Sequence, residues 1–210
     1  MRSSIQPQST YQFDLSGGRL CLDFANTVSG RAIPEQAVDH LRSYEDLVAF
    51  ARQSEALTSP QCEELQALAR RKNRLAETAL RRALDYRELM FRAFAALAEG
   101  AEPETEDLQS ISDLALEALT HRQLKRADGQ YQWHRQWDRR DALDCILWLI
   151  AESAADLLTS AEVKTVRMCE APECAWLFLD QSRNRTRRWC DMKVCGNRQK
   201  ARRHYRRTHL

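Results

Sequence analysis

Four cysteines near the carboxyl end of the chain constrain its fold more than any other feature. Cys169 and Cys174 are separated by four residues, as are Cys190 and Cys195, and fifteen residues lie between the two pairs. Zinc prefers four such ligands in a tetrahedron, and two short loops that each supply two thiolates can build the site without a large core. The spacing therefore predicts one structural Zn²⁺ per chain, whose binding energy becomes folding energy.

Other uses of these thiols stay open at this point: two disulfides, a redox pair, or an iron–sulfur cluster. The first ten residues, MRSSIQPQST, lack the apolar stretch of a secretory signal, so we expect a cytoplasmic protein. Clustered thiols in a reducing compartment are more often metal ligands than disulfides, and the tight Cys-x-x-Cys spacing of redox pairs is missing. Zinc is the favoured interpretation. Cys21, Cys62 and Cys145 lie in apolar patterns and are predicted to be core residues.

Charge is distributed unevenly along the chain. Residues 167–210 contain 12 lysines and arginines against 4 acidic residues, a balance of +8, and the remaining 20 against 26 give −6 for residues 1–166. Such asymmetry predicts that the basic segment meets a polyanion, with nucleic acid the first candidate and a membrane surface the second. The longest apolar run, CILWLIA, falls well short of the ~20 residues needed to cross a bilayer, so we expect no membrane span.

The basic residues of this segment are the predicted nucleic-acid contacts, with duplex DNA as the expected partner. They are Arg183, Arg185, Arg187, Arg188, Lys193, Arg198, Lys200, Arg202, Arg203, Arg206 and Arg207. If the chain is helical from Gly196 onward, Arg198, Arg202 and Arg206 share one stripe. Like charges at this spacing repel, which favours a polyanionic partner over the alternative, a solvated basic tail. Arginine outnumbers lysine, and arginine suits bidentate contacts to phosphate or guanine.

The rest of the chain is predicted to be mainly helical. Helices are expected from Ser43, from Ser59 to Glu99 with a break near Lys72-Asn73, from Glu104 to Leu119, and from an N-cap at Asp138 to Ser160. One β-hairpin is expected at Tyr11–Phe24, with its turn at Ser16-Gly17-Gly18. A second is expected around Asp128-Gly129. The predicted fold class is mainly α with small β-hairpins, an α+β body, plus a small C-terminal four-cysteine zinc-finger module. The expected division is 1–162 for the body and 163–210 for the module.

Two segments resemble a known family. The run WLFLDQSRNRTRRWCDMKVCGNRQKARRHYRR, with Cys-Gly-Asn-Arg at 195–198, resembles the CGNR zinc finger of bacterial proteins regarded as stress-induced transcriptional regulators. The segment GGRLCLDFANTV at 17–28 is similar to the opening of the ABATE domain that accompanies this finger. The resemblance implies a zinc-dependent, DNA-binding transcriptional regulator. Its N-terminal domain would be a sensing or dimerisation module.

Asp23, Asn26 and Thr27 are polar positions beside an apolar segment. They could line a pocket for a small-molecule effector, or Asp23 and Asn26 could cap the turn that follows. The sequence contains no Ser/His/Asp set, phosphate-cradling glycine loop or carboxylate pair at catalytic spacing, so we expect no enzyme. Two other functions stay open: an RNA- or ribosome-binding zinc protein, and a small-molecule enzyme with a structural zinc module. A homodimer formed through the body is also considered.

Overall fold

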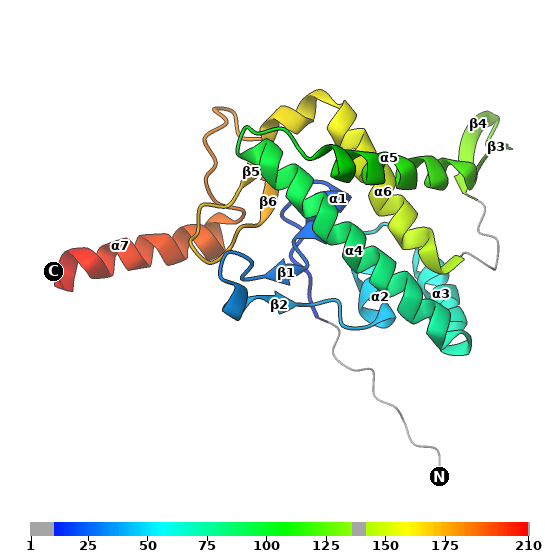
Figure 1. The fold of residues 1–210 in the computed structure, drawn as a ribbon, viewed down its shortest axis with the longest axis horizontal. Coiled ribbons are helices and arrows are strands. Elements are labelled where there is room, and N and C mark those ends of the chain that lie inside the picture. The colour runs from blue at the N-terminus through cyan, green and yellow to red at the C-terminus, as the bar shows by residue number, and fades with distance from the viewer. Residues whose placement is uncertain (1–10, 136–141, 210) are drawn as a thin grey trace, which may run out of the picture.

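The computed structural model describes residues 11–135 and 142–209. Helices gather around the long helix α4, and α7 projects away from them at the carboxyl end (Figure 1). The elements in chain order are α1 (Leu20–Ala25), β1 (Val28–Ser29), the 3₁₀ turn η1 (Pro34–Gln36), β2 (Val38–Asp39), α2 (Tyr44–Gln53), α3 (Ser59–Arg71), α4 (Asn73–Ala98), α5 (Thr105–Thr120), β3 (Arg122–Ala127), β4 (Gln130–Arg135), the 3₁₀ turn η2 (Ala142–Asp144), α6 (Cys145–Thr159), the 3₁₀ turn η3 (Ala161–Thr165), β5 (Val166–Met168), β6 (Leu177–Leu179), the π-helical turn η4 (Met192–Gly196) and α7 (Asn197–His209). The predicted fold class is confirmed.

The predicted helices of the body are confirmed where their local signals are strong. Ser43 caps α2 in a reciprocal capping box with Asp46. The long helical region breaks at Lys72, between α3 and α4, where the backbone leaves the helical region at φ −128° and ψ 51°. α6 ends at Thr159 with Ser160 as its C-cap, close to the expected end, but it begins at Cys145. The predicted N-cap, Asp138, lies outside the described residues.

The hairpin around Asp128-Gly129 is also confirmed. β3 and β4 pair in antiparallel register from Arg122 opposite Arg135 to Ala127 opposite Gln130. Asp128 and Gly129 both have positive φ, 49° and 82°. This is the backbone that a two-residue turn needs to match the twist of the two strands.

The predicted N-terminal hairpin is wrong. Leu20–Ala25 is helix α1, and residues 11–16 form no regular element. Five of the six residues of α1 are buried, Asp23 among them, so buried residues occur on every side of it. A short apolar run of this kind fits a buried strand or a buried helix equally well, and its periodicity could not decide between them. The small β1–β2 pair follows instead.

Two strands of the C-terminal segment belong to the core of the body. β5 and β6 pair with each other, β5 packs on α4, and β6 packs on α1 and α4. Val166, Leu177 and Leu179 lie in the main hydrophobic core. Phe178, whose side chain points to the opposite face of β6, lies in a second cluster with the cysteines. The side chains of β6 therefore belong to both hydrophobic cores, one on each face of the strand.

Among residues 11–135 and 142–209, none of the helices has the length and apolar character that crossing a bilayer demands.

The division expected after residue 162 stays a prediction, and the packing of residues 163–180 gives a specific test of whether residues 1–162 fold alone. A chain that ends at residue 162 loses Val166, Leu177 and Leu179 from the core. Burial of each such side chain contributes about 2 kcal/mol, and a whole domain is stable by only about 5–15 kcal/mol. We expect this fragment to aggregate or to melt well below the full chain, measured by circular dichroism.

A fragment that ends at residue 180 is the matched control, because it retains β5 and β6 and should recover much of the lost stability. Cooperative melting of the shorter fragment near the temperature of the full chain would support independent folding instead.

Candidate metal centre

The first cysteine pair is positioned by the end of the β5–β6 hairpin. Cys169 directly follows β5, and its N–H donates to the carbonyl of Trp176 at 2.8 Å. The N–H of Cys174 donates to the carbonyl of Ala171 at 2.9 Å, which closes a tight turn. Ala175 then turns the chain back toward β6 with a φ of +58°. The two thiols therefore lie at one end of this hairpin.

The second pair is positioned by η4. Cys190 precedes this turn and Cys195 lies in its last part. The carboxylate of Asp191 accepts hydrogen bonds from the N–H groups of Lys193 and Val194, and so caps the turn. The N–H of Glu170 donates to the carbonyl of Arg188 at 3.0 Å, which ties the two cysteine loops together.

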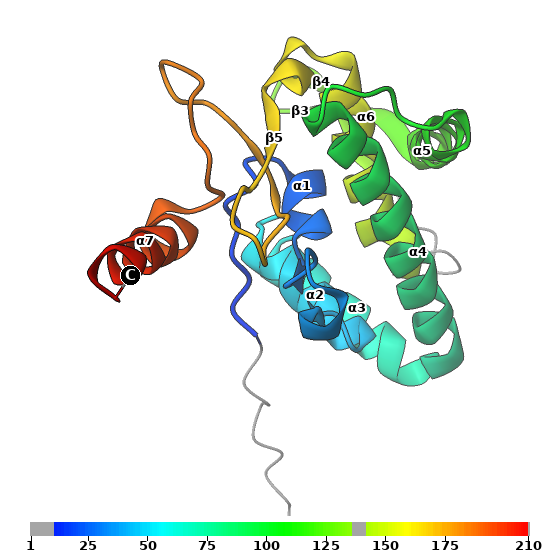
Figure 2. The same cartoon turned by 60° about the vertical axis from the view of Figure 1, so that its left-hand side comes forward.

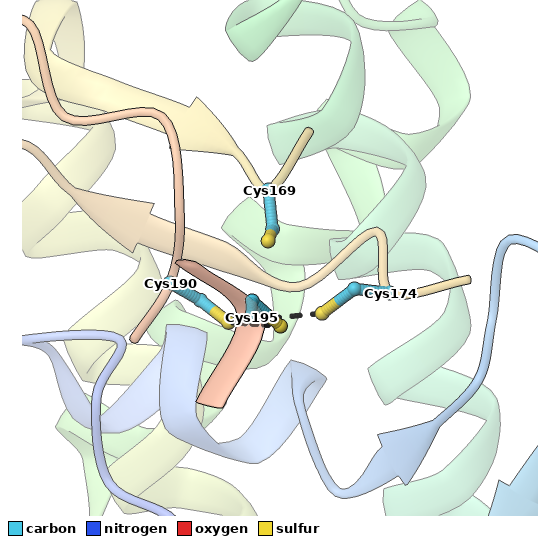
Figure 3. Close-up of side chains that lie close together, drawn as sticks. All are labelled: Cys169, Cys174, Cys190 and Cys195. Carbon is cyan, nitrogen blue, oxygen red and sulfur yellow. Dashed lines mark hydrogen bonds between the residues drawn. The ribbon is translucent and has the colours of Figure 1, made fainter. Parts of the chain in front are cut away.

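The four thiols converge on one point, as Figure 3 shows. One ligand atom from each cysteine lies within 4.8 Å of all the others, and all four residues are buried. The sulfur atoms of Cys174 and Cys190 are 3.7 Å apart, as are those of Cys190 and Cys195. A tetrahedron with Zn–S bonds of about 2.3 Å has sulfur atoms ~3.8 Å apart. The cluster therefore fits one structural zinc ion.

The protonation of the cluster also suits a cation. Hydrogen bonds from Cys174 and Cys190 stabilise a thiolate at Cys169, which lowers the pKa of Cys169. The same hydrogen bonds hold the protons of Cys174 and Cys190 and raise the pKa of both thiols. Thiolates this close repel one another, so a divalent cation at the centre is what allows all four to ionise.

The hydrophobic cluster around the cysteines is very small. It consists of the four cysteines, Ala171 and Phe178, with Trp176 and Trp189 packed against it. A core of this size does not hold a module together without a metal or a disulfide framework. The seven cysteines of the chain are all free thiols in the structure. A bound zinc would therefore supply the energy that orders this module.

Gly196 allows α7 to start close to the metal site. A Cβ atom at this position would lie 2.3 Å from the sulfur of Met192 and 2.9 Å from a ring carbon of Trp189. Both distances are far inside van der Waals contact, so only glycine fits without displacement of the neighbours. In the Cys-Gly-Asn-Arg segment, Cys195 therefore supplies a thiol, Gly196 allows the close contact with Met192 and Trp189, and Asn197 and Arg198 begin α7.

Two of the predicted nucleic-acid contacts, Arg187 and Arg188, bind partners within the module. The Nε of Arg187 donates to the carbonyl of Trp189 at 2.9 Å, and its guanidinium lies 4.5 Å above the ring of Phe178. Arg188 donates to Glu170 at 2.6 Å and lies over the ring of Trp189. These two arginines hold the loop between the cysteine pairs in place.

Arg198 and Arg202 meet at a single carboxylate, that of Glu173. Each guanidinium donates to one of its oxygens at 2.8 Å, and the side chain of Glu173 is only 13% exposed. The hydrogen bond from Arg198 is the largest cause that keeps the pKa of Glu173 low. The contact fixes the first two turns of α7 against the first cysteine loop. Sequence reasoning missed Glu173, although an acid directly before Cys174 in so basic a segment was a signal.

The other predicted contacts face solvent. Arg183 and Arg185 lie on an exposed loop held by the buried carboxylate of Asp180, which accepts from the N–H of Arg187 at 2.9 Å and from that of Ser182 at 3.0 Å. Within the described ranges, the remaining basic side chains make no ion pair with an acidic group. These are Lys193, Lys200, Arg203, Arg206 and Arg207.

The candidate effector residues Asp23, Asn26 and Thr27 have partners within the fold. The amide of Asn26 donates to the carbonyl of Leu177 and accepts from the N–H of the same residue, both at 2.8 Å. Asn26 therefore caps the free edge of β6 as a neighbouring strand would. Thr27 accepts from Arg87 at 3.1 Å, and the carboxylate of Asp23 accepts from the N–H of Gly17 at 2.7 Å.

These three residues are buried, and none of them lines the cavity of about 660 Å³ beside α3 or the cavity of about 440 Å³ beside the cysteines. A role in effector binding remains a prediction, while their contacts account for a structural role.

The geometry of the metal site predicts that the purified protein contains one zinc ion per chain, which elemental analysis measures. The double substitution Cys190→Ser/Cys195→Ser should lose the zinc, because two thiolates cannot complete the tetrahedron. Hydrogen exchange of residues 165–209 should rise sharply, and the melting temperature of the whole chain should fall because β6 is shared. Cys62→Ala, at a buried thiol outside the cluster, is the control and should retain one zinc. Full zinc content in the double variant would refute the assignment.

Asp23 predicts a specific pH dependence of stability. Burial raises the pKa of Asp23 to about 7, against 3.8 for an ordinary aspartate. The folded chain therefore retains a proton that the unfolded chain releases, and this contribution to stability, a few kcal/mol, is fully present below pH 3.8 and is lost progressively as the pH rises from there through 7. Asp23→Asn keeps an acceptor for Gly17 but cannot ionise.

The difference in unfolding free energy between Asp23→Asn and the unsubstituted chain should therefore shift in favour of the variant between pH 5 and pH 8. Other titrating groups cancel in this difference. Parallel curves for the two proteins would contradict the assignment.

Comparison with protein families agrees with this architecture. Residues 18–161 match the ABATE family, described as "Putative stress-induced transcription regulator". Residues 165–208 match the CGNR zinc finger. A search of curated proteins finds no match. The first match spans more than half of the chain, and the two segments that carried the resemblance lie in the two matched regions, apart from Gly17. The chain belongs to the ABATE family and ends in a CGNR zinc finger.

Proposed function

We propose that this chain is a zinc-dependent transcriptional regulator that binds duplex DNA through α7 and the loop between its cysteine pairs. The observation that carries the proposal is the position of α7. This basic helix projects from the body with most of its surface in solvent (Figures 1 and 2). A helix of these dimensions fits the major groove of B-form DNA.

One face of α7 is the proposed contact surface. Lys200, Arg203 and Arg207 follow the i, i+3, i+7 spacing of a single helical face. At 100° per residue this face is turned roughly away from Arg198 and Arg202, which face Glu173. Two of the three arginines in the stripe expected from the sequence, Arg198 and Arg202, are thus paired with Glu173 within the chain. The outward stripe is the better candidate for phosphate contacts, and Arg206 lies at its edge.

The exposed loop supplies a second group of contacts. Arg183 and Arg185 lie on the loop that Asp180 fixes, and their guanidinium groups are free to reach phosphates. Four thiolates and one Zn²⁺ carry −2, so the zinc-loaded segment 167–210 keeps a net charge near +6. The zinc site would hold this loop and α7 in one geometry. Together they would make on the order of five phosphate contacts per chain.

The body is proposed to serve as the sensing or dimerisation module. One cavity, of about 440 Å³, lies between the body and the zinc module. Tyr11 and Asp14 line it on one side, and Trp176 and Arg198 on the other. A small-molecule effector in this cavity would touch the residue that fixes α7 to Glu173. That contact would link effector binding to the position of α7.

The triple substitution Lys200→Ala/Arg203→Ala/Arg207→Ala tests the proposed face. Binding of duplex DNA should weaken, and the log–log salt slope, about −4 to −5 for the unsubstituted chain, should flatten by about 0.9 per lost phosphate contact, or about 3 in all. Fluorescence anisotropy at several salt concentrations measures both. Zinc content should not change, because none of the three residues contacts the metal site.

The matched control is Arg70→Ala/Arg74→Ala/Arg81→Ala, which removes the same charge from exposed positions of α3 and α4. It should leave the slope unchanged. The proposal fails if the zinc-loaded chain binds no DNA at low salt. Decisive competition by structured RNA would assign the same face to RNA instead.

A further inference from the structure

We propose that two copies of this chain form a symmetric dimer in which the β3–β4 hairpin of each copy packs against α5 of the other. The inference deepens the proposed role of the body, and its test does not depend on DNA binding. Its evidence lies at the end of the molecule opposite α7 (Figure 1).

The hairpin is held rigidly at its base. Glu152 of α6 is buried, with a side chain only 7% exposed, and it forms ion pairs with both Arg122 and Arg135. These two arginines lie directly opposite each other in the register of β3 and β4. A buried carboxylate with two guanidinium partners fixes the direction in which the hairpin leaves the body. The hairpin therefore projects as a defined surface.

The face of the hairpin beyond this clamp is apolar and exposed. Leu124 opposite Trp133, and then Arg126 opposite Tyr131, continue the face that begins with the Arg122–Arg135 pair, because side chains of a strand alternate. Leu124 is 60% exposed, Trp133 62% and Tyr131 74%. Two aromatic rings held open on a rigid hairpin are typical of a protein contact surface.

α5 carries a second exposed apolar surface. It packs on α4 and α6 through buried residues such as Ile111, Leu114 and Ala118. Leu116 points to the opposite side of the helix and is 58% exposed, and Leu119 is 50% exposed. A helix whose outer face keeps two leucines in solvent has a surface that a partner could cover.

The two surfaces have opposite charge. α5 contains four acidic residues and no lysine or arginine, and of these Asp113 is exposed one turn before Leu116. The hairpin contains four basic residues against one acidic residue, and Arg126 is exposed beside Tyr131. The contact would therefore join apolar to apolar side chains and arginine to carboxylate.

The two surfaces cannot meet within one chain. The ion pairs of Glu152 direct the apolar face of the hairpin toward α6, whereas Leu116 faces away from α6. Across a two-fold axis the same contact forms twice, because each copy supplies both surfaces. Basic and aromatic residues together could also suit nucleic acid. The acidic α5 beside the hairpin would repel a polyanion, so the second copy is the better occupant.

Sedimentation equilibrium of the full zinc-loaded chain, without DNA, tests the dimer. The expected mass is twice the chain mass of 24.4 kDa. Trp133→Ser and Arg126→Glu should each shift the equilibrium toward monomer. The monomeric variants should still melt cooperatively by circular dichroism, at the temperature of the unsubstituted chain diluted to monomer. Leu75→Ser, at another exposed leucine on α4, is the control and should remain dimeric.

Charge reversal on the other surface adds a stricter test. Arg126→Glu combined with Asp113→Arg should restore the dimer that Arg126→Glu alone loses. The proposal is overturned if the unsubstituted chain is monomeric at all concentrations, or if Trp133→Ser leaves the dimer intact. A monomer whose DNA affinity falls in Trp133→Ser would assign the hairpin to nucleic acid. The α7 triple variant should stay dimeric, which separates this proposal from DNA binding.

Discussion

Strand β6 has no face in solvent, and the rest of the structure depends on that constraint. Leu177 and Leu179 pack into the helical core, while Phe178 packs among the cysteines. Each core therefore needs the other to hold the strand in place. Asn26 completes the arrangement because its amide satisfies both backbone groups of Leu177. Loss of that amide would leave two buried backbone groups unpaired, at about 1–3 kcal/mol each.

Electrostatics in the C-terminal segment divides its arginines into two groups. Acidic residues of the same segment form ion pairs with one group: Glu173 with Arg198 and Arg202, and Glu170 with Arg188. Those that face outward have no such partner among the described residues. The few acids of this segment thus orient basic side chains rather than merely reduce the charge. A strongly basic module can fold in this way and still present free cations on one side.

The sequence predicts most of the fold and the metal site but not how the parts meet. Cysteine spacing and helix caps such as Ser43–Asp46 are local signals, and local signals are enough to predict the metal ligands and the helix starts. Leu20–Phe24 misleads because a segment buried on all sides has no diagnostic period. Glu173 and Asn26 act on residues far away in the sequence, at Arg202 and Leu177, so no local pattern identifies these partners. The direction in which each arginine points is likewise set by tertiary contacts.

Because β6 has one face in each of two cores, the helical body and the zinc finger constrain each other's sequence. Residues of α1 and α4 must accommodate Leu177 and Leu179, and the cysteine loops must accommodate Phe178, which lies between them. A recombination event that joined this finger to a different helical body would leave half of the strand without a fitting neighbour. The segments GGRLCLDFANTV and Cys-Gly-Asn-Arg are far apart in the sequence, yet α1 in the first packs on β6 and Cys195 in the second belongs to the cluster that contains Phe178 of the same strand. They are therefore expected to travel together through evolution as a single unit.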